Sequence, residues 1–222
     1  MKKMKKMYGV LALIVFLALA TSPAMAQDTS MSFFVTSVAP GDGGGDLGGL
    51  HGADMHCQAL AGAAGEGNKN WHAYLSQSNP ALHINARDRI GLGPWYNARG
   101  TLIARDLEHL HSDSVNITEQ TVLTEKGDPV PPEGNDILTG SRIDGTAWPY
   151  ALMDQLNFDG HTLTCRDWTS DALEDLGTLG HINRRGNAGY APWNSTHPSR
   201  GCDAGSIADS GGSGLLYCFA TD

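Results

Sequence analysis

Cysteine is the residue type of this chain with the most defined chemistry. Cys57, Cys165, Cys202 and Cys218 are the four cysteines among 222 residues. An even number in an exported chain predicts two disulfides, because disulfides persist in oxidising compartments. A zinc site is the alternative, but the chain has no Cys-x-x-Cys pair and the spacings are long. Four cysteines allow three pairings, and composition does not choose among them.

Nine histidines offer a second chemistry, either metal binding or acid–base catalysis. His109 and His111 have strand spacing, while His181 and His197 flank the loop that contains Arg184. The sequence contains neither His-Glu-x-x-His nor Gly-x-Ser-x-Gly. Spacing pairs no nucleophile with a base, so we assign no catalytic residue and an enzyme is the weaker class. We interpret these histidines as polar residues whose side chains hold the loop backbone in place.

Oxygen-bearing side chains in two segments are candidate ligands of a cation. Glu133, Asn135 and Asp136 lie in a proline-rich loop, and Asp167 and Asp171 follow the second cysteine. Such oxygens suit Ca²⁺, which takes six to eight of them. The alternative is a set of solvated loop carboxylates, since acidic residues are mostly exposed.

Three tryptophans beside prolines are candidates for ligand contact. Trp95, Trp148 and Trp193 lie in predicted loops, where an indole can stack on a sugar or on a partner side chain. Each can equally cover the core beneath its loop. Trp71 and Trp168 fall in predicted strands, which places them in the core.

The elements that must position these residues alternate between short strands and loops. A helix is predicted over 50–64, where Ala53, Cys57 and Ala61 share one apolar stripe. The segments 106–136 and 177–201 are predicted to be long irregular loops. Strands are predicted at 33–38, 71–75, 100–104, 137–140, 162–168 and 214–219.

The first 26 residues have the pattern of a cleavable export signal. Four lysines precede an apolar run over 10–20, and Ala24-x-Ala26 provides a cleavage site. The run is shorter than the roughly 20 residues of a membrane-spanning helix. We therefore predict a signal peptide over 1–26, a flexible leader over 27–32 and one domain over 33–222. The protein is expected to be secreted or periplasmic, with no membrane association after cleavage.

Charge excludes one class of partner. Removing the four lysines of the signal, and no acid, takes the formal net charge from −9 to −13. An acidic chain with scattered Lys and Arg lacks the electrostatic footprint of a nucleic-acid-binding protein.

The order of elements and several short motifs resemble the C-type lectin-like domain, in particular its bacterial secreted, endostatin-like branch. The motifs span nearly the whole chain after the signal. They are Phe34-Val-Thr-Ser37, Leu47-Gly-Gly-Leu-His-Gly-Ala-Asp54, Ala86-Arg-Asp-Arg-Ile-Gly91, Cys165-Arg-Asp-Trp-Thr-Ser170, Trp193-Asn-Ser195 and Leu216-Tyr-Cys-Phe219.

This resemblance implies an α+β, C-type lectin-like fold with long loops, stapled by two disulfides. In the family the first helix is bridged to the last strand and the two middle cysteines pair. Carried over, that implies Cys57–Cys218 and Cys165–Cys202. The family's ligand loop falls near Trp193 and Asn194.

The resemblance also implies a binding function. We expect a secreted module that contacts a glycan or an extracellular protein, with Trp193, Asn194, Trp148 and Arg184 as candidate ligand contacts. The Glu-Pro-Asn and Trp-Asn-Asp triplets of calcium-dependent members are absent, since Gly134 and Ser195 interrupt them. Ca²⁺ remains the candidate cofactor. The alternatives are a structural or adhesive surface protein without a small ligand, and a hydrolase.

Overall fold

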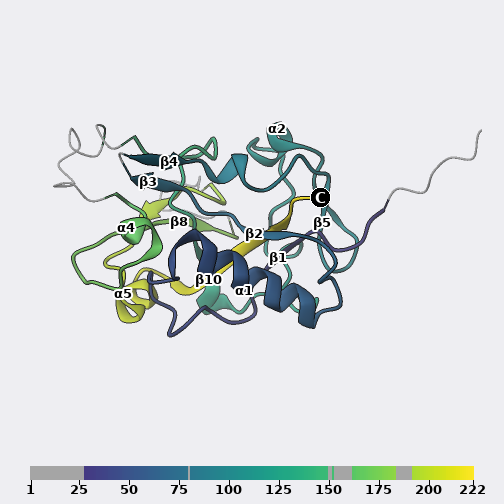
Figure 1. The fold of residues 1–222 in the computed structure, drawn as a ribbon. Helices are drawn as coiled ribbons and strands as arrows, with labels where there is room; N and C mark the ends of the chain where they lie inside the picture. The colour runs from purple at the N-terminus through teal and green to yellow at the C-terminus, as the bar shows by residue number, and fades with distance from the viewer. Residues whose placement is uncertain (1–27, 80, 150–151, 153–161, 184–191) are drawn as a thin grey trace, which may run out of the picture.

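The computed structural model describes residues 28–79, 81–149, 152, 162–183 and 192–222 (Figure 1). The predicted signal peptide and Arg184 lie outside the described residues. Within those ranges the chain is a mixed α+β structure with two disulfides. None of the helices in the described ranges is long and apolar enough to cross a membrane.

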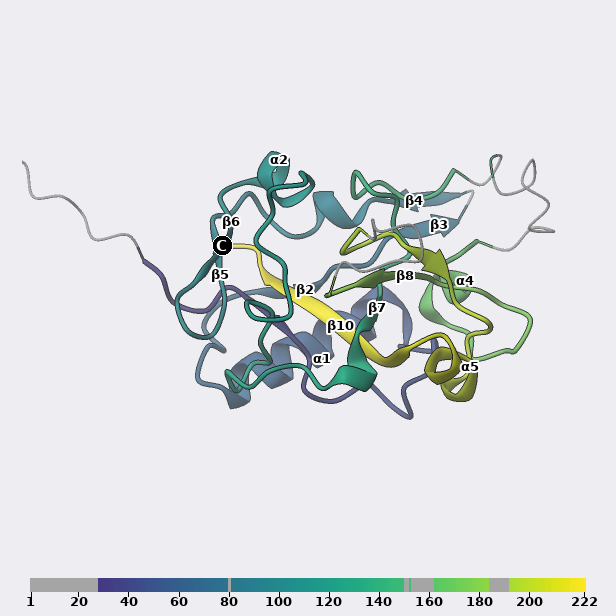
Figure 2. The ribbon, with the colours of Figure 1, turned by 180° about the vertical axis from the view of Figure 1, so that it is seen from behind.

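The last strand, β10 (Gly212–Ala220), is the centre of the main sheet (Figure 2). It pairs antiparallel with β1 (Phe33–Val35) and β2 (Trp71–Ala73), and parallel with β7 (Asp136–Leu138). Beyond β7 lie β8 (Thr178–His181) and β9 (His197–Pro198), both joined by antiparallel pairing. Residues 214–220 are all buried, as expected for a strand covered on both faces.

Side chains of the central strands alternate between two apolar cores, following the two-residue period of a strand. Phe34 and Cys218 point into one core, and Phe33 and Tyr217 into the other. Helix α1 (Gly49–Ala63) covers the first core with Ala53, Cys57 and Ala61, as its apolar stripe predicts. Figure 1 shows α1 lying across β10.

The remaining elements are short and surround the main sheet. Two hairpins and several single turns of helix make up this shell. They are β3 (Gln77–Asn79), β4 (Leu82–Ile84), η1 (Ala86–Asp88), β5 (Trp95–Tyr96), β6 (Leu102–Ala104), α2 (Leu107–Leu110), η2 (Pro132–Gly134), α4 (Cys165–Trp168) and α5 (Ala204–Asp209).

Both disulfides have the pairing that the family resemblance implies. Cys57 of α1 is bonded to Cys218 of β10, and Cys165 of α4 to Cys202, with all four side chains fully buried. The first bond joins residues 161 apart in sequence. Closing so long a loop restricts the unfolded chain and contributes about 5 kcal/mol on the chain-entropy account.

The strand predicted over 162–168 is wrong. Residues 165–168 form the single turn α4, and each of them has a positive φ angle. The Thr164 hydroxyl accepts a hydrogen bond from the amide of Asp167, and the Thr164 carbonyl accepts one from the amide of Trp168. These local bonds and the Cys165 disulfide hold a left-handed turn that non-glycine residues seldom adopt.

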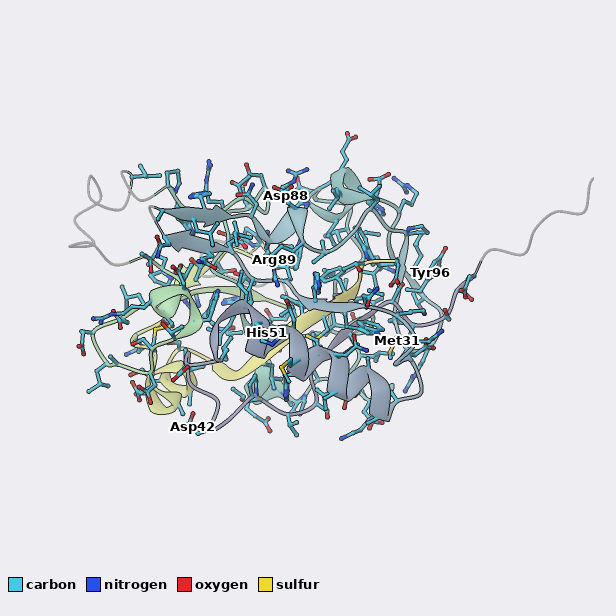
Figure 3. All side chains as sticks on the ribbon, in the orientation of Figure 1. Met31, Asp42, His51, Asp88, Arg89 and Tyr96 are labelled. Atoms are coloured by element: carbon cyan, nitrogen blue, oxygen red, sulfur yellow. A yellow bond between two sulfur atoms is a disulfide. The ribbon has the colours of Figure 1, made fainter. Side chains whose placement is uncertain are left out.

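The predicted leader contacts the domain at Ser30, Met31 and Ser32. Met31 is 6% exposed and belongs to the core beneath α1. Ser32 donates its amide to the carbonyl of Tyr96 and accepts the Tyr96 amide on its hydroxyl. Figure 3 shows Met31 and Tyr96 on the same side of the molecule. The packed part of the chain therefore begins before Phe33.

Candidate functional site

Sheet register brings three ionisable side chains together at one end of β7, β8 and β9. Asp136 is the direct antiparallel partner of His181, and His197 is the partner of Leu179. His181 lies two residues beyond Leu179 on β8, so His197 is its diagonal neighbour. Direct and diagonal partners on adjacent strands share one face of a sheet and are within side-chain reach.

The three side chains meet at their polar atoms. Asp136 Oδ1 lies 3.1 Å from His181 Nε2, and Asp136 Oδ2 lies 3.2 Å from His197 Nε2. The two Nε2 atoms are 2.9 Å apart. The imidazole rings are inclined at 77° rather than stacked, so they approach each other at these nitrogens. We call these three residues the Asp-His-His cluster.

The cluster perturbs the pKa values of two members. Burial acts to raise the pKa of Asp136, but hydrogen bonds to His181 and His197 outweigh it and hold that pKa below its usual value. The hydrogen bond to Asp136 raises the pKa of His197. Both shifts favour the charged forms, as expected for an acid and a base in contact.

The cluster lies at the edge of a cavity of about 360 Å³ that has both polar and apolar walls. Asp136 and His181 line it, together with Glu133, Asn135 and Ser213. The exposed fractions of the Asp136, His181 and His197 side chains are 7%, 13% and 36%. The carboxylate is therefore held inside the protein, while the imidazole edges remain accessible from solvent.

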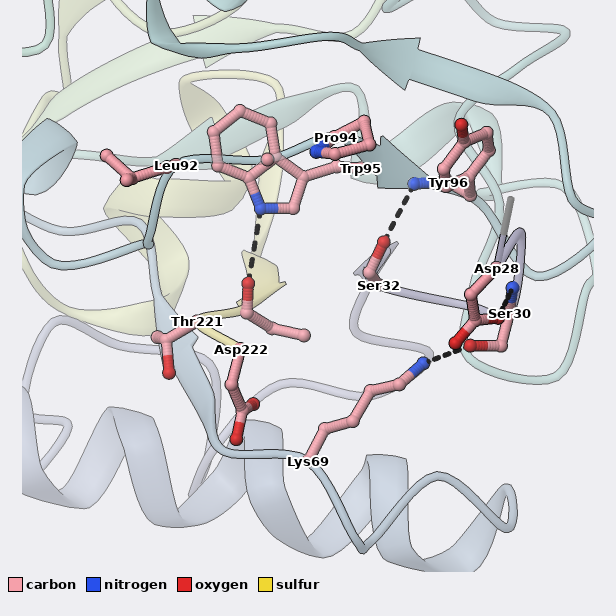
Figure 4. A pocket seen from close by; sticks show the side chains of 12 residues that line it. Asp28, Ser30, Ser32, Lys69, Leu92, Pro94, Trp95, Tyr96, Thr221 and Asp222 are labelled. Atoms are coloured by element: carbon pink, nitrogen blue, oxygen red, sulfur yellow. Dashed lines mark hydrogen bonds between the residues drawn. The ribbon is translucent and has the colours of Figure 1, made fainter. Parts of the chain in front are cut away.

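A second cavity, of about 330 Å³, lies between the two ends of the described chain (Figure 4). Its polar groups are engaged in structural contacts. Lys69 donates to the Ser30 hydroxyl and the Met31 carbonyl and pairs with Glu66 at 3.0 Å. The indole nitrogen of Trp95 donates to the Ala220 carbonyl. These contacts hold the first described residues and the last strand against neighbouring segments, so we assign this cavity a structural role.

The structure places the preferred ligand-binding pair, Trp193 and Asn194, in the core, which corrects that prediction. Trp193 is 3% exposed, and its indole nitrogen donates to the carbonyl of Leu110. Asn194 is fully buried, and its amide nitrogen donates to the Tyr74 hydroxyl and to the carbonyl of Arg142. Neither side chain can reach a sugar or a partner in this conformation.

The other two predicted ligand contacts have different outcomes. Trp148 is half-buried, and its indole nitrogen donates to the hydroxyl of Thr178 at 3.0 Å. One edge of the Trp148 indole is therefore hydrogen-bonded to β8. Arg184 lies outside the described residues.

The predicted oxygen ligands do not form one site. Asp136 belongs to the Asp-His-His cluster, while Glu133 and Asn135 line its cavity. Asp167 Oδ1 instead accepts hydrogen bonds from the amide of Ser78 and the hydroxyl of Thr164. Asp171 is exposed.

The described residues therefore favour a different kind of metal site from the predicted one. The Asp-His-His cluster is the one group of three or more His, Cys, Asp or Glu side chains in the described ranges whose ligand atoms all lie within 4.8 Å of one another. Two of its three donors are nitrogens, whereas Ca²⁺ is bound by oxygens. The donor set of the cluster therefore differs from the all-oxygen set expected for calcium, and the calcium site stays a prediction.

Sequence reasoning assigned His181 and His197 to loop fastening and so missed their role in the cluster. They are 16 residues apart, and Asp136 is a further 45 residues away from His181, so no local motif links them. The signal that could have found them was strand pairing. If 136–138 and 178–181 are read as neighbouring antiparallel strands, the acid and the first histidine fall opposite each other.

The site thus belongs to an α+β protein with two disulfides and a cavity at whose edge three ionisable side chains meet. No protein-family model and no curated protein matches the chain.

Proposed function

We propose that this protein is an extracytoplasmic binding module with a C-type lectin-like fold, which contacts a glycan or an extracellular protein at the cavity beside the Asp-His-His cluster. The observation that carries the proposal is that Asp136 and His181 line that cavity while His197 contacts both of them. A cavity with a few convergent polar groups and perturbed pKa values is the usual form of a ligand site.

The scaffold supports a binding role. The disulfide from Cys57 to Cys218 fixes α1 to the central strand, and that from Cys165 to Cys202 fixes the segment that leads to β8 and β9. Two disulfides suit an oxidising compartment, in agreement with the predicted signal peptide. Loops held on a rigid frame are where binding residues concentrate.

The cavity lining supports a polar ligand. Glu133 and Asn135 offer oxygen and amide groups beside Asp136, and the Ser213 hydroxyl, which also lines the cavity, donates to the Glu133 carbonyl. Hydroxyl-rich sugars and polar peptide groups are recognised by such donors and acceptors. This location replaces the predicted one, because Trp193 and Asn194 are buried.

The test is a glycan array probed with the disulfide-intact protein, followed by affinity measurements on any hit. Glu133→Gln and Asn135→Ala alter side chains at the cavity without touching the core, and we expect each to weaken binding at least about tenfold. Asp88→Asn is the matched control, because Asp88 is an exposed acid outside the cavity. Binding that is equal in all variants would place the ligand elsewhere, and a flat array would favour the structural or adhesive alternative.

A further inference from the structure

We propose that Asp136, His181 and His197 bind a divalent transition-metal ion, with Zn²⁺ as the occupant that fits their donor atoms best. This inference rests on the proposed function only because the zinc site and the proposed ligand site share one cavity.

When both histidines are neutral, unshared electron pairs converge at the centre of the cluster. His197 Nδ1 lies 2.9 Å from the carbonyl oxygen of Pro198, which can only accept a hydrogen bond. Nδ1 therefore carries the proton, and a neutral His197 has a lone pair on Nε2. That lone pair faces the Asp136 carboxylate at 3.2 Å and His181 Nε2 at 2.9 Å.

If both imidazoles are neutral, His197 carries its proton on Nδ1, and only His181 can carry one on Nε2. At most one proton is then available for the three contacts among Asp136, His181 and His197. The contact between His197 Nε2 and Asp136 Oδ2 then sets two lone pairs against each other. A metal ion accepts all of these lone pairs at once. The arrangement therefore matches the requirement of a metal site that histidines be neutral and the carboxylate ionised.

The distances suit zinc coordination. Zinc binds histidine nitrogen at about 2.0–2.1 Å, so two nitrogens of a tetrahedral site lie roughly 3.3 Å apart. The observed separations of 2.9–3.2 Å need to expand by only a few tenths of an ångström. Inclined rings that meet at their Nε2 atoms can both direct lone pairs to one ion.

The surroundings hold these donors in place. The bond from His197 Nδ1 to the Pro198 carbonyl fixes the ring tautomer, which is the usual arrangement around a metal-bound histidine. Gly211 makes room for the carboxylate, because a Cβ atom there would lie 2.8 Å from Asp136 Oδ2. Its φ of +104° is also one that favours glycine.

Three protein donors leave one position of a tetrahedral ion for an external ligand. Zinc sites that bind substrate or water have this composition, whereas structural sites use four protein ligands. Asp136 and His181 line the cavity of Glu133 and Asn135, so the site lies at its wall. An oxygen donor, such as water, a carboxylate or a sugar hydroxyl, is the class of ligand that this position would take.

The rival account is a cluster held by protons alone, with one or both histidines charged. Isothermal titration of the disulfide-intact, metal-free protein with ZnCl₂ at neutral pH, with no glycan or protein present, separates the two accounts. We expect one zinc ion per chain. His197→Gln, His181→Gln and Asp136→Asn should each weaken zinc binding at least about tenfold, since each removes or weakens one donor.

His83→Gln is the matched control, because His83 is an exposed histidine of β4 outside the cluster. The zinc affinity of this variant should equal that of the wild type. His197 has the most exposed side chain of the three, so His197→Gln is the variant expected to keep its fold, which circular dichroism and an intact pair of disulfides would verify. Absence of stoichiometric zinc binding, or binding that His197→Gln leaves unchanged, would overturn the proposal. Neither result would bear on glycan binding measured in the presence of EDTA.

Discussion

The Nε2 atoms of His181 and His197 lie 2.9 Å apart and both face the carboxylate of Asp136. The three residues come from three neighbouring strands, so the sheet itself sets their separation. Each histidine could have been placed on the opposite face by a one-residue shift in register. The cluster is therefore a property of the pairing between β7, β8 and β9.

Zinc should stabilise the folded protein. A ligand that binds only the folded state at 100 times its dissociation constant adds about 2.7 kcal/mol to the free energy of unfolding. For a chain of this size that corresponds to a rise in Tm of about 5–10 °C. Differential scanning calorimetry with ZnCl₂ should show this rise, and EDTA should reverse it. An equal rise in His197→Gln would mean that zinc binds elsewhere.

Gly211→Ala should weaken zinc binding although it removes no ligand. The new Cβ atom would lie 2.8 Å from Asp136 Oδ2 and would displace the carboxylate. The positive φ adds a cost to folding of about 1 kcal/mol or more. Gly62→Ala in α1 is the control, because its Cβ would meet nothing within 4 Å. That variant should keep its zinc affinity and gain about 0.5–1 kcal/mol of stability.

Trp193→Ala should destabilise the fold rather than selectively weaken ligand binding. The indole packs against Tyr74 and Tyr217, with ring centroids 4.7 and 5.1 Å away. Truncating a buried tryptophan costs about 3–5 kcal/mol. Urea unfolding should show this loss, and the half-buried Trp148→Ala should lose less. A stable Trp193→Ala protein would show that this loop can leave the core.

His111 should make the fold sensitive to mild acid. Its Nδ1 lies 2.8 Å from the Leu107 carbonyl and must donate, so its Nε2 accepts from the Tyr74 hydroxyl. Burial lowers the pKa of His111 below 6.5. Well above pH 6.5 the residue is neutral in both the folded and the unfolded state and contributes no pH dependence.

Below pH 6.5 the unfolded chain binds a proton that the folded chain resists, so the free energy of unfolding falls until the pH reaches the lowered pKa of His111. Urea unfolding in EDTA between pH 7.5 and 5 should reveal this loss. His111→Gln should show less of it, because the other titrating groups cancel in the comparison. Equal pH dependence in the two proteins would contradict this assignment.

Much of the scaffold could be predicted from local patterns. The stripe of Ala53, Cys57 and Ala61 indicated α1, and the apolar run at the end of the chain indicated β10. The two disulfides needed the family resemblance, because spacing left three pairings open. The geometry of the Cys57–Cys218 bond then depends on α1 lying across the central strand.

The errors arose where tertiary structure overrides local pattern. Cys165–Trp168 has the composition of a strand, but side-chain bonds from Thr164 and a disulfide hold it in a left-handed turn. Trp193 follows a proline, and its pattern left ligand contact and core packing equally open; the loop folds its ring into the aromatic core. The Asp-His-His cluster depends on pairing between segments 45 residues apart, which composition does not encode.

The most direct measurement is an anomalous difference map at the zinc absorption edge, from crystals of the zinc-loaded, disulfide-intact protein. The account predicts one peak per chain, about 2.0–2.1 Å from Nε2 of both His181 and His197 and bound by the Asp136 carboxylate. A fourth ligand should come from solvent or from a bound molecule. A peak at other residues, or no peak at the cluster while zinc is bound in solution, would contradict it.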